Sequence, residues 1–200
     1  MKRLAGACAA AVLTAGCGGH ERADPAVVRV ELEGATSAAE IATGFVAARG
    51  RVVTVAHVLE PGRRLVVRRG GRVLRGRVLR VDRGDDLALI AVPTPGTGSA
   101  ALHPGVGSGS TRILVVRDGG PEAIDSRVRR PIRATVRGPG TGPYRRPALE
   151  LDARVRLGDS GAPVLDGDGR VAGVVFARAS NGSPTTYAVD ASAIHDLLAR

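Results

Sequence analysis

Apolar residues recur in short runs from residue 27 onward, and within many of these runs apolar and polar residues alternate. Gly, Pro, Asp and Asn separate the runs. Alternation with a period of two is typical of β-strands that bury one face. The pattern predicts an all-β protein whose strands fall into two series.

The first series contains six predicted strands, at residues 27–32, 43–47, 51–59, 64–69, 72–82 and 87–92. Their number and length suit one small antiparallel barrel, which we place at about residues 26–92. A Gly70-Gly71 pair between the fourth and fifth runs predicts a tight hairpin.

A second series follows a stretch rich in Pro, Gly and Ser, residues 93–110, which we interpret as a crossover between two lobes. The six predicted strands of this series are at residues 112–116, 127–136, 148–155, 162–166, 170–177 and 185–190. Asp190 is placed to cap a short C-terminal helix with Ile194, Leu197 and Leu198 on one face. The second barrel and this helix are expected at residues 111–200.

The N-terminus has the features of an export signal. Lys2 and Arg3 precede an apolar run, and the sequence LTAGC, which ends at Cys17, resembles a bacterial lipobox. We expect residues 1–16 to be removed, Cys17 to carry lipid, and residues 17–25 to tether the domain to the outer face of the cell membrane. Plain secretion and a retained signal anchor are the alternatives.

Positive charge dominates the chain, with a formal net charge of +10 and no tryptophan. Nine arginines lie between residues 63 and 83, which suits either a nucleic-acid surface or the solvated face of a hairpin. They alternate with Val and Leu, and no aromatic residue lies among them for base stacking. We therefore expect a solvated strand face and no nucleic-acid partner.

The chain has four histidines, so there are few candidates for a catalytic base. His20, His103 and His195 occupy ordinary settings in the tether, the crossover and the terminal helix. His57 ends a β-branched apolar run, where a histidine is either a structural core residue or a base. Asp86 precedes the apolar run 87–92 and is either a turn residue or a carboxylate that orients an imidazole.

Ser160 lies in the sequence GDSG, between glycines that permit a sharp bend. Such a stretch is either a simple turn or a loop that presents a hydroxyl. In the second case, the amide N–H groups of Gly158 and Ser160 would form an oxyanion hole.

Taken together, His57 in TVAHV, Asp86 in DDLAL and Ser160 in GDSGAPV resemble the chymotrypsin-like, or trypsin-like, serine peptidases. The compact spacing is similar to the bacterial HtrA-like branch, and the similarity covers about residues 27–190. The resemblance implies two six-stranded antiparallel barrels with the active site between them. It implies no metal and no cofactor.

The family's mechanism would make the chain an exported serine endopeptidase acting on peptides or proteins through an acyl-enzyme. Protonation of His57 would remove the base, so activity is expected to fall below about pH 6.5 to 7 in a pH–rate profile. A catalytically silent cell-surface binding module on the same fold is the alternative function.

The resemblance also implies where substrate binds. Val175, Phe176 and Ala177 would belong to the strand that pairs with a peptide substrate. Arg154 falls near the floor of the family's specificity pocket, where an inward-pointing arginine would favour acidic substrates; otherwise it is a surface side chain. No PDZ domain is expected after residue 200, and oligomeric state and cleavage preference stay open.

Overall fold

The computed structural model describes residues 25–93, 100–118, 120–136 and 144–199. The predicted signal, Cys17 and the tether up to residue 24 lie outside these described residues, as do residues 94–99 of the crossover. Within the described residues, no helix is both long enough and apolar enough to span a bilayer.

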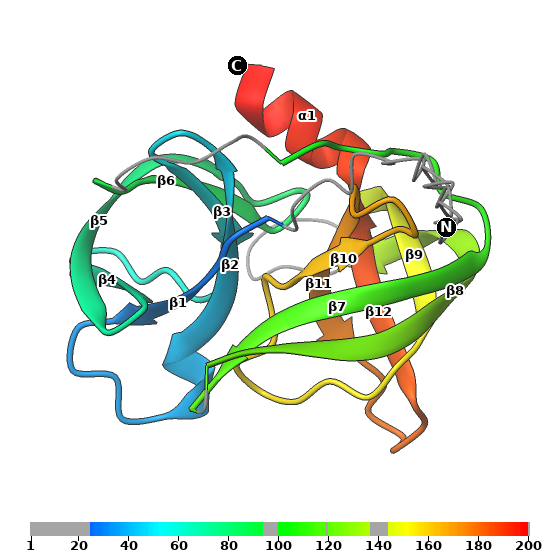
Figure 1. Ribbon diagram of the computed structural model, residues 1–200, viewed down its shortest axis with the longest axis horizontal. Coiled ribbons are helices and arrows are strands. Elements are labelled where there is room, and N and C mark those ends of the chain that lie inside the picture. The colour runs from blue at the N-terminus through cyan, green and yellow to red at the C-terminus, as the bar shows by residue number, and fades with distance from the viewer. Residues whose placement is uncertain (1–24, 94–99, 119, 137–143, 200) are drawn as a thin grey trace, which may run out of the picture.

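The first six strands close into one antiparallel barrel, with the order β1-β2-β3-β6-β5-β4 (Figure 1). β1 completes the closure by pairing with both β2 and β4. The elements are β1 (Val27–Leu32), the 3₁₀ turn η1 (Ala38–Glu40), β2 (Ile41–Ala48), β3 (Arg51–Val55), β4 (Leu65–Arg69), β5 (Arg72–Asp82) and β6 (Leu87–Ala91).

The next six strands close into a second antiparallel barrel, with the order β10-β11-β12-β9-β8-β7. Its elements are β7 (Gly109–Arg117), β8 (Gly120–Val136), β9 (Tyr144–Asp152), β10 (Pro163–Leu165), β11 (Val171–Arg178) and β12 (Thr185–Asp190), followed by α1 (Ala191–Ala199). The predicted all-β fold with two six-stranded antiparallel barrels and a C-terminal helix is confirmed.

Some predicted boundaries were wrong. The strand expected at residues 51–59 ends at Val55, and the last two residues of the expected crossover, 109 and 110, belong to β7. β8 begins at Gly120, seven residues before the predicted start at 127. Residues 120–126 pair with β7, where polar side chains are tolerated because this part of the hairpin is largely exposed.

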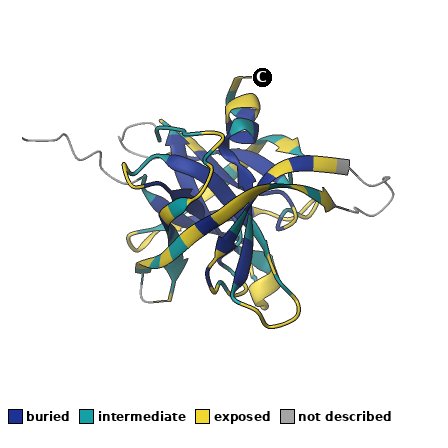
Figure 2. Ribbon diagram, turned by 90° about the vertical axis from the view of Figure 1, so that its right-hand side faces the viewer, coloured by how far each residue is buried: buried dark blue, intermediate teal, exposed yellow. Residues whose placement is uncertain are grey.

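The two barrels share one apolar core. Phe45 and Val53 of the first barrel belong to the same buried cluster as Val174 and Val189 of the second, and α1 adds Ile194 to this cluster. Figure 2 shows the buried residues gathered in the middle of the molecule, with exposed residues on the outer strands and loops. Side chains of this size each stabilise a fold by about 1.5–3 kcal/mol when buried, so the interface is a main source of stability.

Charged side chains also join the barrels. Arg29 of β1 donates from Nε to Glu31 at 2.7 Å and from Nη1 to Asp118, beyond β7, at 3.3 Å. Arg68 donates from Nε to the other oxygen of Glu31 at 2.5 Å. Burial raises the pKa of the Glu31 carboxyl, but the hydrogen bonds from the two arginines outweigh this effect and hold it below its ordinary value. Glu31 is therefore ionised at neutral pH and organises this corner.

Candidate active site

His57 and Asp86 lie together at one end of the first barrel. β3 ends at Val55, and the N–H of Ala56 donates to the Asp86 carbonyl at 2.9 Å. The Asp86 carboxylate accepts the backbone N–H of His57 at 2.9 Å, and its second oxygen lies 2.7 Å from His57 Nδ1. A carboxylate in this position favours a proton on Nδ1 and leaves Nε2 as the basic nitrogen.

His57 is more exposed than Asp86, as expected for a base that must reach a substrate and a carboxylate that only orients it. The His57 side chain is 46% exposed, whereas that of Asp86 is 17% exposed. Asp86 has a φ of 55°, the one positive value among the described residues other than glycine. Strained backbone of this kind persists where the surrounding contacts hold it, and here three hydrogen bonds do so.

Ser160 lies in a tight loop that precedes β10. Gly158 and Gly161 have φ values of 92° and 86°, in a region that residues with a Cβ rarely adopt. Within the described part of the chain, no hydrogen bond occupies the amide N–H of Gly158 or of Ser160. Both amides therefore remain available to an oxygen of a bound molecule.

Thr43 of β2 holds this loop from the other barrel. Its backbone N–H donates to the Ser160 carbonyl at 2.8 Å, and its Oγ1 donates to the Gly158 carbonyl at 3.2 Å. The same Oγ1 accepts the N–H of Val116 in β7 at 3.2 Å. Thr43 is completely buried, so these contacts are shielded from water. No motif in the sequence marks Thr43 for this role.

Gly161 brings the loop close to the strand that leads to His57. A Cβ built on Gly161 would lie 2.0 Å from the carbonyl oxygen of Thr43 and 2.5 Å from Thr54 Oγ1. Thr54 is in β3, three residues before His57. The structure therefore brings the loop of Ser160 against the strand whose end carries His57.

Asp159 anchors the loop within the second barrel. Its side chain is 1% exposed and accepts from Arg117 Nη2 at 2.9 Å and from the backbone N–H of Arg156 at 2.9 Å. The hydrogen bond with Asp159 raises the pKa of the Arg117 guanidinium, outweighing the opposing effect of burial. A carboxylate this buried requires its cation, because an unpaired buried charge is strongly destabilising.

The three expected substrate-binding residues of β11 lie beside the same loop. The Val175 carbonyl accepts the N–H of Gly161 at 2.7 Å, and the Val175 N–H donates to the Ala162 carbonyl at 2.9 Å. β10 pairs with β11 only as far as Val174, so no described strand lies beside Phe176 and Ala177 on that side. A free edge at this position can add a peptide as a strand.

Other predicted residues lie in different settings. The Arg154 side chain is exposed and donates from Nη1 to the Gly182 carbonyl at 3.5 Å, which corresponds to the surface alternative. His103, expected in an ordinary setting, lies 2.5 Å from the carboxylate of Asp166 through Nδ1. Arg170 also donates to Asp166 at 3.0 Å. Although burial raises the pKa of the Asp166 carboxyl, hydrogen bonds from the backbone N–H of Arg170, from the His103 and Arg170 side chains and from the N–H of Asp168 hold it below its usual value.

Among the described residues, no three His, Cys, Asp or Glu side chains gather as a metal-ligand set. The arrangement at His57 and the Ser160 loop suits proton transfer and nucleophilic attack, with a carboxylate-supported imidazole, a hydroxyl on a tight loop and two available amides.

Comparison with known proteins agrees with this description. Residues 42–174 match the model of the trypsin-like peptidase domain. Serine protease Rv3671c of Mycobacterium tuberculosis is 32% identical over 165 residues, covering 79% of this chain and 41% of that protein. Mitochondrial serine protease HTRA2 of Bos taurus is 30% identical over 199 residues, covering 90% of this chain and 42% of that protein.

A solved structure is also similar. The active form of the Rv3671c protease from M. tuberculosis superposes with a TM-score of 0.76 at 29% identity, covering 88% of this chain and 80% of that one. The chain spans about two fifths of the length of the curated relatives it matches. The family model covers more than half of the chain, and the structural agreement extends over both barrels. The chain belongs to the trypsin-like peptidase family.

Proposed function

We propose that the chain is a serine endopeptidase in which Ser160 is the nucleophile, His57 the base and Asp86 the residue that orients His57. The observation that carries this proposal is the double contact of the Asp86 carboxylate with the backbone N–H and Nδ1 of His57. Relatives that are named serine proteases support the same activity.

In the proposed reaction, His57 Nε2 accepts the proton of the Ser160 hydroxyl as Oγ forms a bond to the substrate carbonyl carbon. The carbonyl oxygen becomes negative and is stabilised by the amides of Gly158 and Ser160. The C–N bond then breaks, and the leaving amine takes the proton from His57. Water attacks the acyl-enzyme with the same proton transfers, which releases the acid and restores Ser160.

A fluorophosphonate probe tests this assignment, because it phosphonylates a serine only when that serine is activated as a nucleophile. We expect the probe to label the wild-type protein and to leave Ser160→Ala unlabelled. Ser183→Ala is a matched control that removes another hydroxyl and is expected to label normally. A folded wild-type protein that resists the probe would instead favour the silent binding module.

We also propose that the protein is exported and anchored by lipid on Cys17, supported by the charged start, the apolar run and the LTAGC sequence. Metabolic labelling with a palmitate analogue in a bacterial host tests this. We expect label on the wild-type protein and none on Cys17→Ala, and equal labelling of the two would exclude anchoring at this residue.

A further inference from the structure

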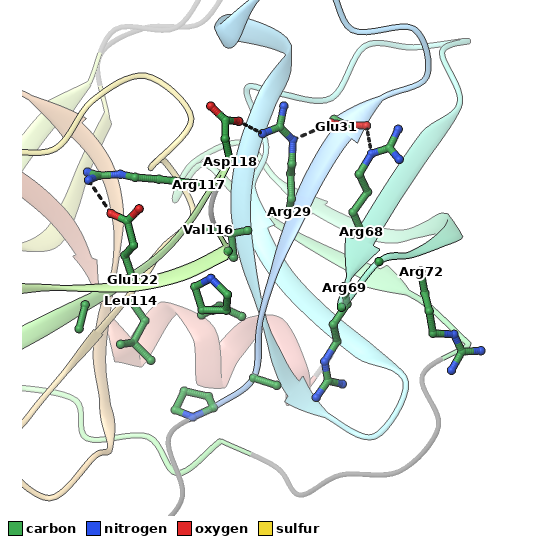
Figure 3. A pocket seen from close by; sticks show the side chains of 18 of the residues that line it. Arg29, Glu31, Arg68, Arg69, Arg72, Leu114, Val116, Arg117, Asp118 and Glu122 are labelled. Carbon is green, nitrogen blue, oxygen red and sulfur yellow. Dashed lines mark hydrogen bonds and ion pairs between the residues drawn. The ribbon is translucent and has the colours of Figure 1, made fainter.

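A groove runs between the β4–β5 hairpin of the first barrel and the β7–β8 hairpin of the second (Figure 3). It encloses about 1140 Å³. A smaller cavity of about 300 Å³ shares five wall residues with it, among them Val116 and Asp118. Gly158 and Asp159, which precede Ser160 directly, also line the smaller cavity. The two adjoining cavities together therefore lead from the loop that carries Ser160 to the β4–β5 hairpin of the first barrel.

The walls of the groove carry an excess of positive charge. Six arginines and three carboxylates line it, which leaves three positive charges in excess. All three carboxylates are already paired with arginines: Glu31 with Arg29 and Arg68, Asp118 with Arg29, and Glu122 with Arg117.

Arg69 and Arg72 are the two wall arginines whose charges are not compensated within the described residues. They are direct partners across the β4–β5 hairpin, and like charges at opposed positions of a sheet destabilise it. In Figure 3 no dashed line reaches either guanidinium, in contrast to Arg29 and Arg68. A carboxylate bound beside this pair would remove the repulsion.

Apolar side chains complete the wall and indicate a peptide. Val73 is 58% exposed next to Arg72, and Leu114 and Val116 line the groove from β7. No described residue of β11 lines either cavity. Because β11 is the strand expected to pair with one side of a substrate, the groove is left for the segment on the other side of the scissile bond, which we assign as the carboxyl side.

We propose that this groove docks an acidic segment of the protein substrate on the carboxyl side of the scissile bond, a proposal that rests on the proposed peptidase function. Carboxylates of the segment would approach Arg69 and Arg72, and its apolar side chains would contact Val73. The site would select substrates by a sequence several residues away from the bond that is cut.

The test compares three versions of one peptide that the full-length protein cleaves, chosen from a digest of denatured proteins. The first carries a short run of glutamates on the carboxyl side, the second carries the same run on the amino side, and the third carries glutamines on the carboxyl side. We expect the first to have the highest kcat/KM, mainly through a lower KM, and the advantage to shrink at high ionic strength.

The variant Arg69→Gln/Arg72→Gln is expected to lower kcat/KM for the carboxyl-side glutamate peptide about three- to tenfold more than for the glutamine peptide. Arg75→Gln/Arg77→Gln is the matched control, because both arginines are exposed on β5 and line neither cavity. The control is expected to change all three peptides equally. Equal losses in the two variants, or a preference for amino-side glutamates, would overturn the proposal.

Binding to the Ser160→Ala protein separates this proposal from the proposed function. Fluorescence anisotropy of the labelled carboxyl-side glutamate peptide is expected to show saturable binding that Arg69→Gln/Arg72→Gln weakens. If the wild-type protein resisted the fluorophosphonate probe but this binding persisted, the peptidase would fail and the docking site would stand. If the probe labelled the wild-type protein but peptide binding did not depend on Arg69 and Arg72, the peptidase would stand and the docking site would fail. An equal affinity for duplex DNA or anionic vesicles would also overturn the docking site, because the groove would then bind anions without preference for a peptide.

Discussion

Replacing Asp86 with asparagine is expected to slow peptide hydrolysis by about 10⁴-fold while both barrels stay folded. Asparagine has the same shape but presents a neutral amide to His57 Nδ1, which now lies 2.7 Å from a carboxylate oxygen. Either the amide donates to Nδ1, which moves the imidazole proton to Nε2, or the contact is lost. In both cases Nε2 no longer serves as a well-oriented base, and the imidazolium formed during the reaction loses its counter-charge.

The backbone conformation at residue 86 can be kept by asparagine, so the substitution changes the side-chain chemistry without adding backbone strain. Asp86 has a φ of 55°, and asparagine is among the few residues that adopt this conformation readily. Asp85→Asn, one residue earlier, makes the same chemical change next to the site and is expected to retain activity within about threefold. The measurement is kcat/KM on a cleavable peptide, with circular dichroism to verify folding. An Asp86→Asn protein within about tenfold of wild type would remove Asp86 from the mechanism.

Gly161→Ala is expected to cost about 4 kcal/mol or more of the free energy of unfolding, or to prevent folding altogether. A methyl group would lie 2.0 Å from the carbonyl oxygen of Thr43, and that oxygen belongs to the backbone of a buried strand. The φ of 86° adds strain of its own. The overlap could be relieved only by moving β2 away from the loop, and the strain only by changing the backbone conformation of the loop itself.

Gly34→Ala separates the two causes. Gly34 also has a positive φ, of 75°, but nothing lies within 4 Å of the Cβ that would be added. This variant is expected to lose about 1 kcal/mol through backbone strain alone. Urea unfolding of the two variants gives the comparison. Equal losses would mean that the close approach to Thr43 contributes nothing.

Short apolar runs separated by turn residues predict the strands of this fold well, because β1, β2, β3, β6, β11 and β12 are buried at most positions on both faces, while β7 alternates between buried and half-buried positions. β1 and β5 begin and end where the alternation does. The apolar pattern does not predict residues 120–126 of β8 as a strand, because this part of the hairpin is largely exposed and neither face needs to be apolar. It also extended β3 past Val55, because Ala56 and Val58 are buried without belonging to a strand.

The residues that we propose as catalytic could be predicted from local sequence because each lies in a short motif that resembles the family. The residues that hold the Ser160 loop in place could not be predicted in this way. Thr43 contacts a loop 115 residues later, and Arg117 reaches Asp159 across 42 residues. Only the folded topology brings such pairs together, and a threonine or an arginine within a strand has many ordinary roles.

The hydrogen bonds from Thr43 also make the shape of the nucleophile loop a property of the barrel interface. The loop is part of one barrel, but its Gly158 and Ser160 carbonyls are held by the other. A slight parting of the barrels would release those carbonyls before either sheet melted. Turnover would then be lost ahead of the global unfolding transition, so catalysis would report on the docking of the two halves.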